Sequence, residues 1–176
     1  MLIGLLSDTH IAWPSQGLPP QIRDAFKGVD LILHAGDIWI SWVLDELELI
    51  APVLAARGDD DLESDIGGDL RVAPRQVLSL EGVTVWVTHI KPRYSLVSPS
   101  QHPYPAWFRH EPAQAEGPPD VVVFGHTHLQ EIENYKGVLL VNPGSPTLPS
   151  YVPRLGTVGL LTIESGQVTA RLVALE

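Results

Sequence analysis

The sequence predicts a mixed α/β protein in which two stacked mixed β-sheets are flanked by helices. Short continuous apolar runs recur along the chain, and such runs are typical of strands buried on both faces. In the first half these runs alternate with helix-like stretches, an order that implies parallel pairing of the strands. In the second half they occur in pairs around short glycine-containing turns, which indicates antiparallel hairpins.

The first half of the chain supplies three expected strands and two expected helices. The strands are the apolar runs 2–6, 31–33 and 53–56. A short helix is expected over 21–27, directly after two prolines. A longer helix is expected over 39–50, because apolar side chains recur there at helical spacing until Pro52 ends the pattern.

The second half supplies three expected hairpins. Each has a two-residue turn that ends in glycine, at Glu81-Gly82, Lys136-Gly137 and Ser165-Gly166. The paired strands are expected over 76–80 with 83–88, 130–135 with 138–141, and 156–164 with 167–175. This half is therefore expected to be largely antiparallel.

A length of 176 residues, 44% of them hydrophobic, fits a single domain that spans 1–176. The segment 91–119 stands apart, because it carries seven of the chain's 16 prolines and several aromatic residues. A connection of this length is often a functional lid. A surface excursion that packs its own aromatic side chains, or an oligomer contact, fits equally well. Trp13 and Pro14 form a second apolar loop, just after His10.

Composition excludes several classes of protein. The chain has no cysteine, which rules out disulfides, thiolate metal sites and cysteine nucleophiles. Its start shows no signal-peptide pattern, and no stretch reaches the roughly 20 apolar residues that span a bilayer. We therefore expect a cytoplasmic protein with no membrane contact. The net charge of −10 argues against general nucleic-acid binding, and it fits either ordinary solubility or bound cations.

Five apolar runs end on side chains that can bind a metal. These donors are Asp8, His10, Asp37, Asp59, His89, His126 and His128. Ligands of open α/β sheets bind beyond the carboxyl ends of the strands, so we expect the donors to converge on one crevice. The triplets 8–10 and 126–128 each place two donors one residue apart, and extended backbone would turn both to the same side. Taken singly, each residue also has an ordinary role in a core, a turn or a helix cap.

The order and spacing of these motifs resemble those of the calcineurin-like metallophosphoesterase superfamily. The matching motifs are Asp8-Thr9-His10, Gly36-Asp37, Gly58-Asp59-Asp60-Asp61, Thr88-His89 and Gly125-His126-Thr127-His128. The segment 142–146 also resembles the loop that follows the histidine pair in the small prokaryotic phosphodiesterases of this superfamily. The resemblance covers nearly the whole chain and implies the family's αββα sandwich.

The resemblance implies a binuclear metal centre. One metal would be held by Asp8, His10, Asp37 and His128, and the other by Asp37, Asp59, His89 and His126. Asp37 would bridge the two cations, because a carboxylate has two oxygens to share. Mixed imidazole and carboxylate donors suit divalent transition metals. Manganese is the first expectation, with iron, zinc, cobalt or nickel as alternatives.

The activity that the resemblance implies is hydrolysis of a small or nucleotide-like phosphodiester. A hydroxide held by the two metals would attack phosphorus in line with the leaving oxygen, and Asp37 and Asp59 would contribute to catalysis as ligands. The rival interpretation is a catalytically weak or inactive scaffold for protein assembly, because the retromer small subunit shares this fold and serves in such assembly. A homo-oligomer is compatible with either interpretation.

Three positions depart from the family pattern. Asp59 stands where asparagine is usual, Asp60 where many members have a histidine that assists the leaving group, and Ile90-Lys91 where relatives often have Gly-His. Asp60, Lys91 and Asn142 are candidate substrate contacts. The ordinary alternatives are a solvated or turn-capping Asp60, a surface Lys91 and a turn residue at Asn142. For Asp61 we expect the turn-capping role.

Overall fold

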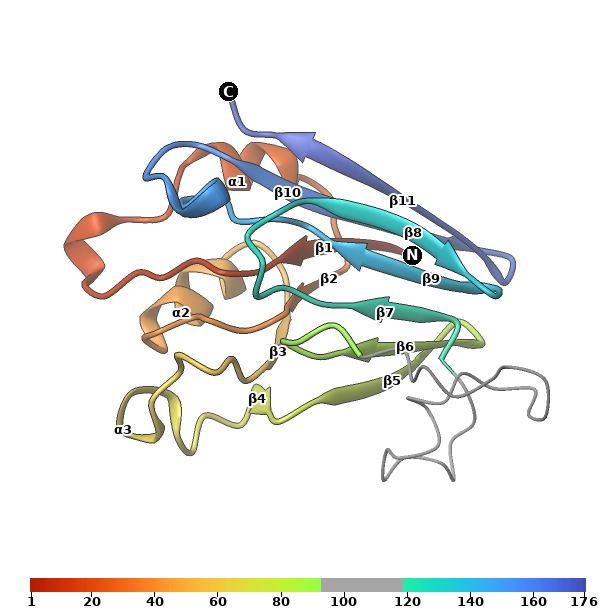
Figure 1. The fold of residues 1–176 in the computed structure, drawn as a ribbon, viewed down its shortest axis with the longest axis horizontal. Helices are drawn as coiled ribbons and strands as arrows, with labels where there is room; N and C mark the ends of the chain where they lie inside the picture. The colour runs from red at the N-terminus through yellow and green to blue at the C-terminus, as the bar shows by residue number, and fades with distance from the viewer. Residues whose placement is uncertain (93–118) are drawn as a thin grey trace.

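A computed structural model describes residues 1–92 and 119–176 of the chain, and it shows two β-sheets packed face to face (Figure 1). The first sheet has six strands in the order β11-β10-β1-β2-β3-β4. These strands are β1 (Leu2–Leu6), β2 (Leu31–His34), β3 (Val53–Ala56), β4 (Val72–Ala73), β10 (Thr157–Glu164) and β11 (Gln167–Ala174).

The second sheet has five strands in the order β5-β6-β7-β9-β8. They are β5 (Gln76–Leu80), β6 (Val83–Val87), β7 (Val121–Val123), β8 (Glu131–Tyr135) and β9 (Val138–Asn142). Most of the segment 91–119 lies outside the described residues, so the interpretations offered for it stay open.

Parallel pairing in the first half is confirmed, because β1 pairs with β2, and β2 with β3, in parallel. The expectation of a largely antiparallel second half is only partly right. In the second sheet β6 pairs with β7, and β7 with β9, in parallel. The hairpin pattern shows that β8 and β9 are partners, but it does not show which of them lies beside β7. Because β9 is the inner strand, the centre of this sheet is parallel.

All three expected hairpins are present, as β5–β6, β8–β9 and β10–β11. Both turn residues have positive φ in each hairpin: 49° and 83° at Glu81-Gly82, 50° and 87° at Lys136-Gly137, and 52° and 76° at Ser165-Gly166. Positive φ at both central positions is the signature of the turn that matches the right-handed twist of paired strands. Glycine takes the second position without a steric penalty.

The helices are short: α1 (Gln21–Ala25), α2 (Trp42–Glu48) and α3 (Glu63–Ile66), with 3₁₀ turns η1 (Pro14–Gln16) and η5 (Pro149–Tyr151). The helix expected over 39–50 begins only at Trp42. Trp39 has a φ of 77°, which no helix contains, and its backbone N–H donates to Asp61 instead. None of the helices within the described ranges has the length and apolar character needed to cross a bilayer.

Side chains from each helix pack on the outer face of the first sheet. Ile22 of α1, Leu44 of α2 and Ile66 of α3 share an apolar cluster with Leu6 and Ile32 of that sheet. The next residues along the same strands point the other way and form the core between the two sheets, where Ile3 and Leu5 meet Val85, Val87 and Val123. Burial on both faces explains why these strands read as continuous apolar runs.

Candidate metal centre

The seven donor residues lie beyond the carboxyl ends of five strands, three from one sheet and two from the other. In Figure 1, β1 and β7 both run towards the left of the view, so their carboxyl ends lie at the same edge of the two layers. The donors that follow β1, β2, β3, β6 and β7 assemble there into two groups of side chains that could each hold a metal ion. The donors therefore converge on one edge of the two sheets.

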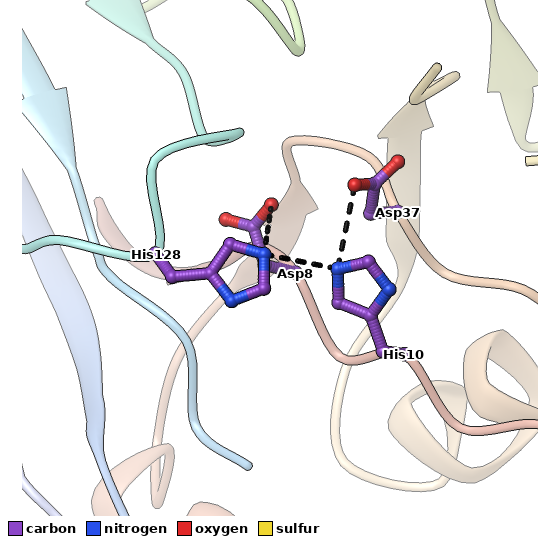
Figure 2. A group of neighbouring side chains, drawn as sticks. All are labelled: Asp8, His10, Asp37 and His128. Atoms are coloured by element: carbon purple, nitrogen blue, oxygen red, sulfur yellow. Dashed lines mark hydrogen bonds and ion pairs between the residues drawn. The ribbon is translucent and has the colours of Figure 1, made fainter. Parts of the chain in front are cut away.

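The first group contains Asp8, His10, Asp37 and His128 (Figure 2). One ligand atom from each residue lies within 4.8 Å of the others. The Nε2 atoms of His10 and His128 are 3.1 Å apart, and His128 Nε2 lies 3.7 Å from Asp8 Oδ1. Asp8 and His128 are buried, so this group is enclosed by protein.

The second group contains Asp59, His89 and His126. Asp59 Oδ1 lies 2.8 Å from His89 Nε2 and 3.1 Å from His126 Nδ1. Half of the Asp59 side chain is exposed, whereas His89 is buried. This group therefore opens to solvent on the side of Asp59 and His126.

Asp37 connects the two groups. Its Oδ2 atom lies 3.4 Å from His10 Nε2 in the first group and 3.3 Å from His89 Nε2 in the second. Its Oδ1 atom accepts a hydrogen bond from the backbone N–H of Asp60 at 3.1 Å. The first group has the same four members as the first set that the resemblance implied, and the second group has the second set's members apart from Asp37. Their role as metal ligands remains a prediction.

The protonation pattern of the imidazoles fits bound cations. His89 Nδ1 donates to the carbonyl of Ala35 and His128 Nδ1 to that of Leu148, both at 2.8 Å. Each neutral ring then carries a lone pair on Nε2, facing the centre. His89 Nε2 is buried and lies 2.8 Å from Asp59 Oδ1 and 3.3 Å from Asp37 Oδ2. A lone pair among carboxylates is favourable only with a proton or a cation between them.

The pKa values describe the same electrostatic situation in the metal-free protein. Burial alone would lower the pKa of His89, but the hydrogen bond and charge of Asp37 outweigh it and raise that pKa to about 9. Burial opposes ionisation of Asp37 too, yet the His89 hydrogen bond and charge lower the Asp37 pKa overall. Burial raises the pKa of Asp8 and lowers the pKa of His10. Asp37 and His89 are thus paired so that charge on one stabilises charge on the other, whereas burial dominates at Asp8 and His10.

The backbone at the donors is left-handed, not extended as we expected. Five of the seven have positive φ: Asp8 (55°), His10 (46°), Asp37 (57°), His126 (71°) and His128 (57°). Residues with a Cβ rarely adopt such angles, and they concentrate at functional sites where surrounding contacts hold them. His126 and His128 lie in different groups, whereas Asp8 and His10, which have the same spacing and also positive φ, lie in one group.

Two glycines allow the strand ends to approach closely. A Cβ on Gly58 would collide with Asp37, including its backbone nitrogen and Oδ1. A Cβ on Gly125 would collide with the Ser7 hydroxyl and come within 2.9 Å of Asp8 Oδ2. The glycines that precede Asp59 and His126 in sequence are therefore required by contacts between segments from different strands.

Asp61 holds the loop that carries Asp37. Its buried carboxylate accepts four backbone N–H groups, from Asp37, Ile38, Trp39 and Gly58, at 2.7–3.0 Å. The expected capping role is therefore present, but it spans two strand ends and so positions the loop that carries Asp37. The sequence signal was a third aspartate in 59–61, and nothing in it indicated that the bonds reach residues 37–39.

Asn142 and Lys91, two candidate substrate contacts, are engaged with other protein groups. Asn142 Nδ2 donates to the carbonyl of Gly125 at 3.0 Å, and its Oδ1 accepts the N–H of Gly144 at 2.9 Å. Asn142 thus braces the segment that carries His126 and His128. Lys91 Nζ contacts Glu131 at 2.6 Å and Glu133 at 2.8 Å, on β8.

Asp60, the third candidate substrate contact, is exposed, and it borders a cavity of about 580 Å³ together with Asp59. Its backbone N–H donates to Asp37 Oδ1. Nothing in these placements tests a direct contact with substrate, and the three assignments stay predictions.

Comparison with known proteins identifies the family. Residues 1–166 match the model of the calcineurin-like phosphoesterase superfamily domain. The chain is 34% identical to a probable metallophosphoesterase of Methanothermobacter thermautotrophicus, over 98% of this chain and 92% of that protein. It is 28% identical to a phosphodiesterase of Methanocaldococcus jannaschii, over 93% of this chain and 94% of that protein.

Among solved structures, wild-type Vps29 of Entamoeba histolytica in complex with zinc has a TM-score of 0.66, covers 100% of both chains and is 20% identical. At that identity the likeness shows a shared fold alone. The family model and the curated relatives cover nearly the whole length of the sequence, including every donor residue. The chain belongs to the calcineurin-like phosphoesterase superfamily, a superfamily of hydrolases, and it carries a candidate metal-binding cluster at the carboxyl ends of its strands.

Proposed function

We propose that the protein is a metal-dependent phosphodiesterase that hydrolyses a small or nucleotide-like phosphodiester. The observation that carries the proposal is the position of Asp37 Oδ2, at 3.3–3.4 Å from an imidazole nitrogen of each donor group. A carboxylate oxygen that lies between the two donor groups favours binding of two cations over one. Asp8, His10, Asp37 and His128 would hold the first ion, and Asp37, Asp59, His89 and His126 the second.

Imidazole and carboxylate donors favour manganese, iron, zinc, cobalt or nickel over magnesium and calcium, and manganese is our first choice. When bound, two such cations acidify a water and offset the negative charge that develops on a phosphoryl group. The protein residues orient the donors and keep them in the protonation state that binds a cation.

Second contacts fix the orientation of the donors. Asp8 accepts hydrogen bonds from the Ser7 hydroxyl and from the His126 backbone N–H, which partly offset the rise in its pKa that burial causes. The Tyr151 ring stacks on His128 at a centroid distance of 4.1 Å, and its hydroxyl donates to the carbonyl of His126. Such contacts to ligand side chains set their geometry and basicity.

The residues at the site favour diesters with good leaving groups. An ionised aspartate at position 60 cannot donate a proton to a poor leaving oxygen. The net charge of −10 disfavours long polyanions and is compatible with small diesters. A relative named as a phosphodiesterase, 28% identical to this chain, supports the same substrate class.

Hydrolysis of bis-p-nitrophenyl phosphate tests the proposal. The protein should turn over this diester with added manganese, should lose activity with a chelator, and should hydrolyse p-nitrophenyl phosphate more slowly. Asp37→Asn should lower kcat/KM by about 100-fold or more, because it removes the shared anion. Asp24→Asn, a change on the exposed side of α1, is the matched control and should leave kcat/KM unchanged.

The second candidate function is a weakly active or inactive scaffold for protein assembly. The fold likeness to Vps29, a protein crystallised with zinc, keeps it in view, because fold and metal content alone do not establish turnover. A scaffold has no need for all seven donors, which argues for the enzyme. If the protein binds manganese stoichiometrically but hydrolyses neither diesters nor monoesters, the scaffold is the better account.

A further inference from the structure

An apolar cavity lies directly beside the second donor group. Its volume is about 580 Å³, and Trp13, Trp39, Ile40 and Leu62 form its apolar wall, while Asp59 lies at its edge. Trp13 is 68% exposed and Leu62 is 61% exposed. Large apolar side chains that stay exposed around a hollow usually mark a binding surface. Here the cavity is lined in part by Asp59, a predicted metal ligand.

The loop that carries Trp13 is held in place. Gln16 Oε1 accepts the backbone N–H groups of Ala12 and Trp13, at 2.7 and 2.9 Å. The 3₁₀ turn η1 closes the same loop, with the N–H of Gln16 donating to the carbonyl of Trp13 at 3.0 Å. The exposed indole of Trp13 is therefore presented by a defined backbone.

Trp39 lines the cavity, and its backbone conformation is strained. Its φ of 77° is unfavourable for a bulky side chain, and two hydrogen bonds from Ile38 and Trp39 to Asp61 hold that conformation. The indole meets the ring of His10 edge-to-face, at 5.0 Å between centroids and 87° between planes. Trp39 thus joins a donor of the first group to the wall of the cavity.

The charged groups of the cavity are acidic. Asp60 and Asp65 line it together with Asp59, and no lysine or arginine does so within the described ranges. An anionic group would be repelled here, whereas a neutral ring or one that carries amino N–H groups would be accepted. By contrast, Arg154 lines a separate cavity of about 440 Å³ on the side of His10.

We propose that the cavity between Trp13 and Trp39 binds a planar aromatic arm of the substrate, either uncharged or bearing amino groups, while the phosphate lies at the metal centre. Base-like rings, which combine a π-face with N–H donors, are the chemical class that fits. This assignment rests on the proposed function and names the substrate class of the same site.

Binding of two simple phosphates tests the aromatic subsite. Titration calorimetry of the manganese-loaded protein with phenyl phosphate and with methyl phosphate compares ligands that differ in the ring alone. Phenyl phosphate should bind about tenfold more tightly, as expected for stacking of one ring on an aromatic side chain. Trp13→Ala should remove most of that preference, and Trp13→Phe should retain most of it.

Leu62→Ala is a further test, and Leu70→Ala is its matched control, because both leucines are exposed and only Leu62 lines the cavity. The first substitution should weaken phenyl phosphate several-fold, and the second should have no effect. Equal affinity for the two phosphates in the wild-type protein, or a preference that survives Trp13→Ala, would overturn the assignment.

A charged ring tests the acidic character of the cavity. 4-Carboxyphenyl phosphate should bind more weakly than phenyl phosphate, and the double substitution Asp60→Asn, Asp65→Asn should reduce that difference at least about threefold. A carboxyphenyl ligand that binds as well as phenyl phosphate to the wild-type protein contradicts an acidic subsite and favours the cavity of Arg154.

These binding measurements separate the two proposals. Trp13-dependent binding of phenyl phosphate without hydrolysis of any ester would reject the phosphodiesterase and keep the subsite. Suppose instead that the protein hydrolyses bis-p-nitrophenyl phosphate, binds phenyl and methyl phosphate equally, and is unaffected by Trp13→Ala. That result would reject the subsite and keep the phosphodiesterase.

Discussion

Asp37 Oδ2 lies 3.3 Å from His89 Nε2, although Asp37 follows β2 of one sheet and His89 follows β6 of the other. This contact joins the carboxyl edges of the two layers. It also explains the opposite pKa shifts of the two groups, because each stabilises the ionised form of its partner. The predictions below concern what this junction, and the residues that hold it, contribute to metal binding and stability.

Asp59→Asn should raise turnover and weaken metal binding. Asp8, Asp37 and Asp59 bring three negative charges to the proposed pair of cations, and asparagine would leave two. A less neutralised pair acidifies its water more strongly. We expect kcat for bis-p-nitrophenyl phosphate to rise several-fold and the Kd for manganese to rise about tenfold.

The matched control for this change is Asp24→Asn, which neutralises an exposed carboxylate of α1 outside both donor groups and should leave kcat unchanged. Unchanged or reduced turnover in Asp59→Asn would contradict the charge argument.

Asp61→Asn should destabilise the protein. The buried carboxylate of Asp61 accepts four backbone N–H groups, and an amide would place its own N–H₂ group against some of them. We expect the free energy of unfolding in urea to fall by about 2–4 kcal/mol. Asp65→Asn, an exposed change, should cost less than about 0.5 kcal/mol. Equal stability of the two variants would show that the Asp61 network is dispensable.

The metal-free protein should lose stability as pH rises from about 6.5 to about 9. Asp37 raises the pKa of His89 from 6.5 to about 9 on folding, against the effect of burial. A raised pKa stabilises the folded state fully below 6.5, and this contribution disappears as pH passes through the folded-state value. Urea unfolding of chelated protein at several pH values measures the decline, and His89→Gln should flatten it. A wild-type free energy that rises across this window would reject the His89–Asp37 pairing.

Below that window the sign of the effect reverses. Complete burial lowers the pKa of His34 to about 3, and this histidine is neutral between Thr9 and the N–H of Gly36. A lowered histidine pKa makes folding less favourable as pH falls from 6.5 towards 3, because only the unfolded chain takes up the proton. The stability of the metal-free protein should therefore pass through a maximum near neutral pH. In the His34→Gln variant, stability should fall less steeply on the acid side of that maximum.

Asn142→Ala should impair metal binding more than substrate binding. Removal of the amide leaves the carbonyl of Gly125 and the N–H of Gly144 without these bonds, at a cost of about 1–3 kcal/mol. We expect weaker manganese affinity with a near-normal KM once metal is saturating. Asn134→Ala is the control, because Asn134 is exposed on β8 and accepts one backbone N–H, that of Gly137, away from the donors. A raised KM with unchanged metal affinity would instead support a direct contact between Asn142 and substrate.

The local chemistry of the chain was readable from its sequence. Apolar runs buried on both faces predicted the strands, and glycine in the second turn position predicted all three hairpins, because both signals depend on neighbouring residues. The order of the donor motifs identified the family, and the seven candidate donors that it named lie together in the structure. The sequence missed the start of α2, because Trp39 takes its left-handed conformation from Asp61, a residue 22 positions away.

Only the tertiary structure decided which donor atoms meet and what surrounds them. Asp37 meets His89 because two sheets end at the same edge. The insertion of β9 beside β7 and the cavity between Trp13 and Trp39 are likewise contacts between distant segments. Residue types and their spacing determine which chemistry is available, whereas the packing of the two layers determines which atoms meet.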